Sequence, residues 1–185
     1  QAMQLYGIGD LHLSLGVPEK PMDIFHGWEN YMQLLEQHWR AMDQPEDTVV
    51  LAGDLSWGMT LPQAKADFAF LETLPGQKII LKGNHDYWWN SMKKMQQFFA
   101  DPGFNSLHIL HTNHYAFQQY GFCGTRGWVS INGETADAKV LAREVQRLEV
   151  SIQSALKEQL TPIVFLHYPP IYGNSYNYEI GRAHV

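Results

Sequence analysis

The chain has 185 residues, of which 45% are hydrophobic and 17% charged, so we expect a folded domain with a sizeable core rather than a disordered chain. The net charge of −6 disfavours nucleic acid and anionic membranes as partners, because both need a broad positive surface. A small phosphorylated substrate is compatible with this charge if bound metal ions supply positive charge locally.

Cys123 is the only cysteine, which excludes an intrachain disulfide and favours a reducing compartment. No apolar run approaches the roughly 20 residues of a membrane span. The first predicted strand begins too close to residue 1 to leave room for a signal peptide. We therefore expect a cytoplasmic protein with no membrane partner.

The first half of the chain alternates predicted strands with predicted helices. Apolar runs at 5–9, 48–52 and 78–82 predict buried strands. Between them, large apolar residues recur at helical spacing from Trp28 to Met42, and Thr60 is suited to cap a second helix. This alternation predicts a parallel sheet.

The second half begins with a helix for which Asn90 is the expected N-cap. Short β-like runs, expected to pair in antiparallel or mixed fashion, follow at 107–110, 115–118 and 121–123. The clearest helix covers 136–160, with an apolar side that includes Leu156. A last apolar strand is predicted at 163–166.

Four of the predicted strands end in side chains of the type that bind metal ions: Asp10 and His12, Asp54, Asn84 and His85, and His167. The carboxyl ends of parallel strands meet at one edge of a sheet, so these side chains are expected to converge. Two of them, Asp10 and His12, are separated by one residue and would share one face of an extended segment. Oxygen and imidazole ligands suit Mn²⁺, Fe²⁺ or Zn²⁺, which predicts a divalent metal site.

The order Asp-x-His, Gly-Asp, Gly-Asn-His-Asp and then a His after a strand resembles the calcineurin-like metallophosphoesterases from Asp10 to His167. The resemblance implies an α/β fold, a four-layer α/β/β/α sandwich of two mixed sheets flanked by helices. It also implies a metal-dependent phosphoester hydrolase in which two divalent ions hold a bridging hydroxide for in-line attack on phosphorus.

Carried over by motif, the resemblance implies that Asp10 and His12 bind one metal ion. Asp54 would bridge both ions, and Asn84 and His167 would bind the second.

The same resemblance implies that His85 acts as proton donor or charge stabiliser beside the phosphate, with Asp86 accepting its other ring proton. Two further residues are candidates for substrate binding. Trp57 flanks the motifs and could stack on a ring of the substrate, although such residues more often belong to the core or its rim. Arg126, in a turn-rich loop, could bind a phosphate or carboxylate or form a structural salt bridge.

The family pattern closes with a Gly-His-x-His motif, and the sequence contains none. We therefore expect that the C-terminal part of the fold is missing, that 1–178 form a single incomplete domain, and that this chain as given has reduced or no activity. The tail 179–185 is expected to be non-native, because one back-translation of it resembles a sequencing-adapter read.

Two other functions compete with hydrolysis. One is a protein-interaction module that keeps the metallophosphoesterase fold without activity, which predicts eroded ligands, whereas each expected ligand up to His167 is present. The other is a nuclease of the same family, which the acidic composition disfavours.

Overall fold

The computed structural model describes residues 3–42, 44–129, 135–172, 175–176 and 180. The chain packs into two compact units, which are described separately. Unit 1 comprises 1–80 with 84–109, and unit 2 comprises 81–83 with 110–185. Most of the predicted tail, namely 179 and 181–185, lies outside the described residues. Of the helices that the structure describes, none is long and apolar enough to cross a membrane.

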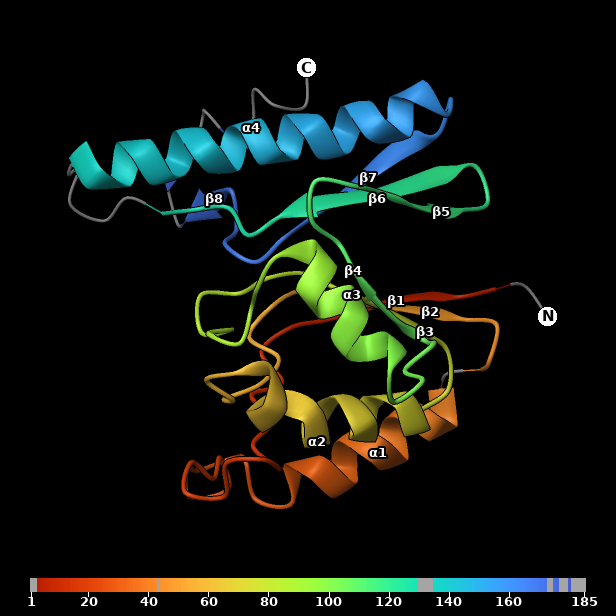
Figure 1. The fold of residues 1–185 in the computed structure, drawn as a ribbon, viewed down its shortest axis with the longest axis vertical. Coiled ribbons are helices and arrows are strands. Elements are labelled where there is room, and N and C mark those ends of the chain that lie inside the picture. Colours follow the sequence, from red (N-terminus) through yellow and green to blue (C-terminus); the bar gives the residue numbers. More distant parts are fainter. Residues whose placement is uncertain (1–2, 43, 130–134, 173–174, 177–179, 181–185) are drawn as a thin grey trace. The chain divides into compact units, whose positions relative to one another are not determined.

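Unit 1 contains a four-stranded parallel sheet in the order β1-β2-β3-β4 (Figure 1). Its strands are β1 (Leu5–Ile8), β2 (Thr48–Leu51), β3 (Gln77–Ile80) and β4 (Leu107–Ile109). The intervening helices are α1 (Tyr31–Met42), α2 (Leu61–Thr73) and α3 (Met92–Ala100). The predicted alternation and parallel pairing are confirmed for β1 to β3. The expectation of antiparallel or mixed pairing is wrong for β4, which adds to the parallel sheet beside β3.

The core of unit 1 is centred on Phe68 of α2, which is fully buried. Its ring packs edge-to-face against Trp88 at 5.0 Å and against Phe99 of α3 at 4.9 Å between centroids. Edge-to-face packing places the positive ring edge on the negative ring face, which adds to the free energy gained from apolar burial.

Side-chain caps fix where α2 and α3 begin. Thr60 caps α2 as predicted, because its Oγ1 accepts a hydrogen bond from the backbone N–H of Gln63. The predicted cap of α3 is wrong by one residue: Ser91 Oγ accepts from the N–H of Lys94, whereas Asn90 Oδ1 accepts from the N–H of Ser91.

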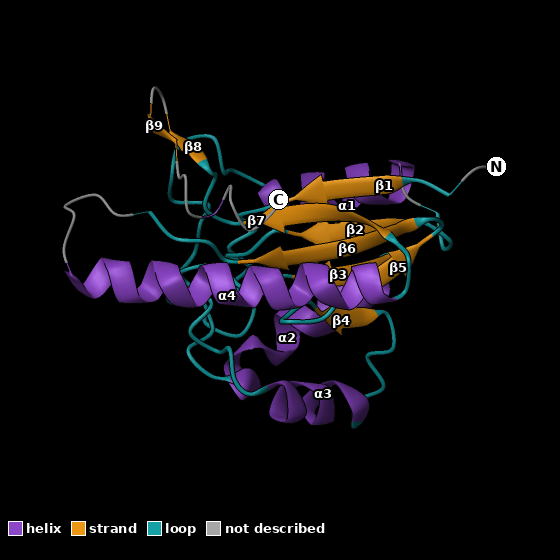
Figure 2. Ribbon diagram, turned by 90° about the horizontal axis from the view of Figure 1, so that it is seen from above, coloured by secondary structure: helices purple, strands orange, loops and turns teal. Residues whose placement is uncertain are grey.

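Unit 2 contains a three-stranded sheet of β5 (Tyr115–Phe117), β6 (Tyr120–Thr125) and β7 (Thr161–Leu166). The β5–β6 pair is antiparallel and the β6–β7 pair is parallel. The crossover between β6 and β7 is α4 (Thr135–Lys157), which lies along this sheet (Figures 1 and 2). A short hairpin of β8 (Ile171–Tyr172) and β9 (Ser175–Tyr176) follows.

The apolar side of α4 packs Leu148, Ile152 and Ala155 against Cys123 of β6. Cys123 therefore behaves as a small buried hydrophobe. The expectation that Leu156 belongs to this side is wrong, since the residue is 45% exposed. The molecule is thus a mixed α/β protein with two main sheets and four helices among its described residues.

We expect Phe68→Ala to lower the free energy of unfolding by about 3–5 kcal/mol, because it leaves a cavity between the rings of Trp88 and Phe99. Phe25→Ala is the matched control: Phe25 is 53% exposed, so its loss should change stability by less than about 0.5 kcal/mol. Urea unfolding measures both. Equal effects of the two substitutions would contradict the assignment of the core.

Candidate metal centre

The loops that follow β1 and β2 run side by side and bring together the first three predicted ligands. The two strands pair in parallel, with Ile8 opposite Leu51, so both loops leave the sheet at the same edge. Backbone hydrogen bonds continue beyond the strands, from Asp10 N–H to Gly53 O at 3.0 Å and from His12 N–H to Asp54 O at 2.9 Å. These bonds fix Asp10 and His12 against Asp54.

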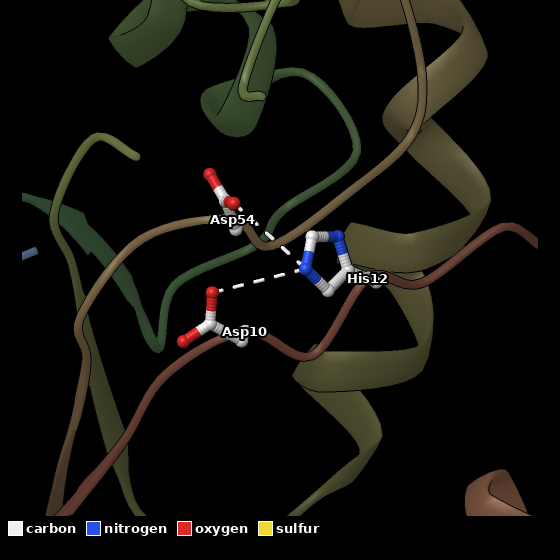
Figure 3. Close-up of side chains that lie close together, drawn as sticks. All are labelled: Asp10, His12 and Asp54. Atoms are coloured by element: carbon white, nitrogen blue, oxygen red, sulfur yellow. Dashed lines mark ion pairs between the residues drawn. The ribbon is translucent and has the colours of Figure 1, made fainter. Parts of the chain in front are cut away.

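Potential ligand atoms of Asp10, His12 and Asp54 all lie within 4.8 Å of one another (Figure 3). The Nε2 atom of His12 is 3.7 Å from Asp10 Oδ1 and 3.8 Å from Asp54 Oδ2. These separations are too long for hydrogen bonds. They match two ligands of one ion, which lie roughly 2.8–4.4 Å apart when the metal–ligand bonds are about 2.0–2.2 Å. The three side chains therefore fit a divalent cation.

All three residues have a left-handed backbone conformation, with φ of 57° at Asp10, 46° at His12 and 52° at Asp54. This conformation is unfavourable for residues with a β-carbon and concentrates at functional sites. The expectation of an extended segment from Asp10 to His12 is therefore wrong. The side chains converge because the backbone turns at each of these three residues. Hydrogen bonds between the two loops hold the backbone in this conformation.

The site is deep at Asp54 and open at Asp10, whose side chains are 3% and 62% exposed. Burial lowers the pKa of His12, while the carboxylates of Asp54 and Asp10 act in the opposite direction. A lowered pKa favours the neutral imidazole, which is the form that binds a metal ion.

The motif after β3 joins the site through Asp54. Its Oδ1 accepts a hydrogen bond from the backbone N–H of His85 at 2.8 Å, and its Oδ2 lies 2.7 Å from His85 Nδ1. The side-chain nitrogen of Asn84, Nδ2, is 3.2 Å from the same His85 Nδ1. His85 is thus next to Asp54, and Asn84 contacts the His85 ring.

Asp86, expected from the sequence to accept a ring proton of His85, binds the backbone of the Asp54 turn, and its role at the His85 ring stays a prediction. Its buried carboxylate accepts hydrogen bonds from the backbone N–H groups of Asp54 and Leu55, both at 2.8 Å, and from the indole N–H of Trp88 at 3.1 Å. The Nδ1 atom of the His85 ring lies against Asp54 Oδ2. Asp86 therefore fixes the turn that presents Asp54.

A second buried carboxylate, Asp67 of α2, was not identified from the sequence. It accepts hydrogen bonds from Ser56 Oγ at 2.5 Å and from the backbone N–H of Leu15 at 2.9 Å, and so ties the two ligand-bearing loops to α2. Burial raises the pKa of Asp67, against the effect of both hydrogen bonds. Its position on the same helix face as Ala64 and Leu71 was the available signal, because an acid on a core-facing stripe needs a polar partner.

Trp57, one of the predicted substrate residues, packs directly on the site. Its ring stacks on His12 at 4.9 Å with an interplanar angle of 24°, and lies 5.2 Å from the ring of His85. Its indole N–H donates to Met22 Sδ at 3.2 Å. Trp57 thus forms a wall of the site against both imidazoles.

The remaining predicted residues, Arg126 and His167, belong to unit 2. Thr125 of β6 pairs with Leu166 of β7, so the two residues follow neighbouring parallel strands at one edge of the sheet. Arg126 Nη2 lies 3.4 Å from the buried carboxylate of Glu144, and its guanidinium lies over the Trp128 ring. The salt bridge, one of the two alternatives for Arg126, is therefore formed. The substrate role of Arg126 and the ligand role of His167 stay predictions.

The fold makes this a mixed α/β protein. Its candidate metal site consists of two aspartates and a histidine at parallel strand ends, next to an Asn-His pair. The family model described as calcineurin-like phosphoesterase matches residues 3–184. The chain belongs to this calcineurin-like phosphoesterase family, and membership indicates metal-dependent phosphoester hydrolysis as its general activity.

Two other comparisons give no information on function. A crystal structure of the protein of unknown function AQ665 from Aquifex aeolicus is similar at 17% sequence identity and a TM-score of 0.44, over 88% of this chain and 89% of that chain. None of the curated proteins matches this chain.

We expect Asp86→Ala to lower the free energy of unfolding by about 3 kcal/mol or more, because it leaves several buried N–H groups without an acceptor. Asp86→Asn keeps one acceptor oxygen and should cost less. Urea unfolding and the metal content of the purified variants measure both effects. Full stability and full metal content in Asp86→Ala, with only turnover reduced, would instead support contact with His85.

Proposed function

We propose that this protein is a phosphoester hydrolase with a dinuclear metal centre that takes two Mn²⁺, Fe²⁺ or Zn²⁺ ions. The observation that supports this best is the convergence of Asp10, His12 and Asp54 within 4.8 Å in a chain of the calcineurin-like phosphoesterase family. The four-layer α/β/β/α sandwich of that family is part of the proposal.

In this proposal Asp10 and His12 hold one ion, and Asp54 contributes to both. Asn84 and His167 hold the second. The contact between Asn84 and His85 supports the place of Asn84 beside Asp54, since His85 itself lies against that carboxylate.

When bound, the ions would supply a bridging hydroxide for in-line attack on phosphorus and positive charge that stabilises the transition state. His85 would protonate the leaving oxygen, a contribution of about 10²–10⁴-fold in rate. Its side chain is 38% exposed, so it is accessible to a substrate, while its backbone N–H and Nδ1 are both held by Asp54. Asp54 therefore orients the ring.

The proposed substrate is a small phosphorylated molecule in the cytoplasm, with Trp57 and Arg126 as candidate contacts. The sequence has no Gly-His-x-His motif, so the proposal includes lower activity for this chain than for a form that contains the motif. The presence of each expected ligand up to His167 favours hydrolysis over an interaction module.

We expect Asp54→Ala to lose bound metal, because it removes a ligand shared by both ions, and His85→Ala to keep the metal. Metal analysis after dialysis against Mn²⁺ tests this, and assays on aryl phosphate mono- and diesters test turnover. His85→Ala should lower turnover by about 10²–10⁴-fold.

The matched control is His26→Ala, because the side chain of His26 is fully exposed. It should keep both metal and turnover. An Asp54→Ala protein with a full metal complement would contradict the bridging role, and unchanged turnover in His85→Ala would contradict its role as acid.

A further inference from the structure

A pocket of about 290 Å³ lies in unit 1 between the loop that follows β1 and the start of α1. Its apolar wall includes Leu15, Met22 and Met32, and its polar groups include Asp23 and Asn30. Ligand pockets of this kind combine apolar walls with a few polar groups that fix orientation. The volume suits a group of about the size of a substituted aromatic ring.

Three contacts connect this pocket with the candidate metal centre. Tyr31, which lines it, donates its hydroxyl hydrogen to the backbone oxygen of His12 at 3.1 Å. Met22, also in the lining, accepts the indole hydrogen of Trp57. Trp57 in turn stacks on the His12 ring. One layer of side chains therefore separates the pocket from a predicted metal ligand.

The charge of the pocket is negative. Asp23 is the one charged residue among its lining residues, all of which belong to the described part of the chain. The lining includes neither Lys nor Arg.

We propose that this pocket binds the organic part of the substrate and selects a positively charged group, a protonated amine, rather than a second anion. The amine would pair with Asp23, and the carbon skeleton would lie against Met22, Met32 and Leu15. A second phosphate or a carboxylate would face Asp23, and none of the lining residues is a Lys or Arg that could balance it. The link to hydrolysis rests on the proposed function, whereas binding of the amine does not.

Binding is tested with three phenols that share a ring and differ in charge: tyramine, 4-ethylphenol and 3-(4-hydroxyphenyl)propionate. We expect tyramine to bind the purified full chain about two- to fivefold more tightly than 4-ethylphenol, the range typical of an exposed ion pair, and the propionate most weakly. Amide NMR signals of the Leu15–Met32 segment report the site. Equal binding of all three, tighter binding of the propionate, or failure of tyramine to bind would overturn the proposal.

Asp23→Asn should remove the preference for tyramine, and Asp23→Lys should reverse it in favour of the propionate. Glu19→Gln is the matched control, because it removes one exposed carboxylate from the same loop without altering the pocket lining. Loss of the preference in Glu19→Gln to the same degree would show a general charge effect and overturn the assignment to Asp23.

The aryl phosphates of the same three phenols separate this inference from the proposed function. Hydrolysis of none of them, also by a form that contains the Gly-His-x-His motif, with tyramine still bound preferentially through Asp23, would contradict the hydrolase and leave the pocket supported. Hydrolysis of all three at equal kcat/KM, without a binding preference, would contradict the pocket and leave the hydrolase supported.

Discussion

The site depends on one buried carboxylate, Asp86, that binds the backbone of another loop. Asp86 follows β3. Its carboxylate oxygens accept hydrogen bonds from backbone N–H groups of the turn after β2 and from the indole N–H of Trp88. A buried carboxylate is stable only when such charge-assisted hydrogen bonds replace water. Because those N–H groups belong to Asp54 and Leu55, the same interaction positions the most deeply buried predicted ligand.

A second carboxylate extends this arrangement to the other loop. Asp67 joins Ser56, just past the Asp54 turn, to Leu15, just past His12. Left-handed backbone at Asp10, His12 and Asp54 costs about 1–3 kcal/mol per residue and persists only where the surroundings determine it. The hydrogen bonds between the loops, together with Asp86 and Asp67, provide those surroundings. The three predicted ligands are therefore held in place by the protein itself.

The sequence predicted the convergence of Asp10, His12 and Asp54 because that convergence follows from topology. Strands that alternate with helices are parallel, and parallel strands bring Asp10, His12 and Asp54 to one edge. The roles of Asp86 and Asp67 were not predictable from local pattern, because each depends on a backbone segment that is distant in sequence. Local pattern also failed for the α3 cap, where Asn90 and Ser91 are both good N-caps and only the backbone geometry selects Ser91.

Electron paramagnetic resonance of the protein titrated with Mn²⁺ tests the central claim, a metal centre built around Asp54, most directly. Two ions that share one carboxylate are close enough to couple magnetically. We expect an exchange-coupled spectrum at two Mn²⁺ per chain. The spectrum of hexaaquo Mn²⁺ throughout the titration would contradict a metal site, and a single uncoupled bound ion at saturation would contradict the dinuclear centre.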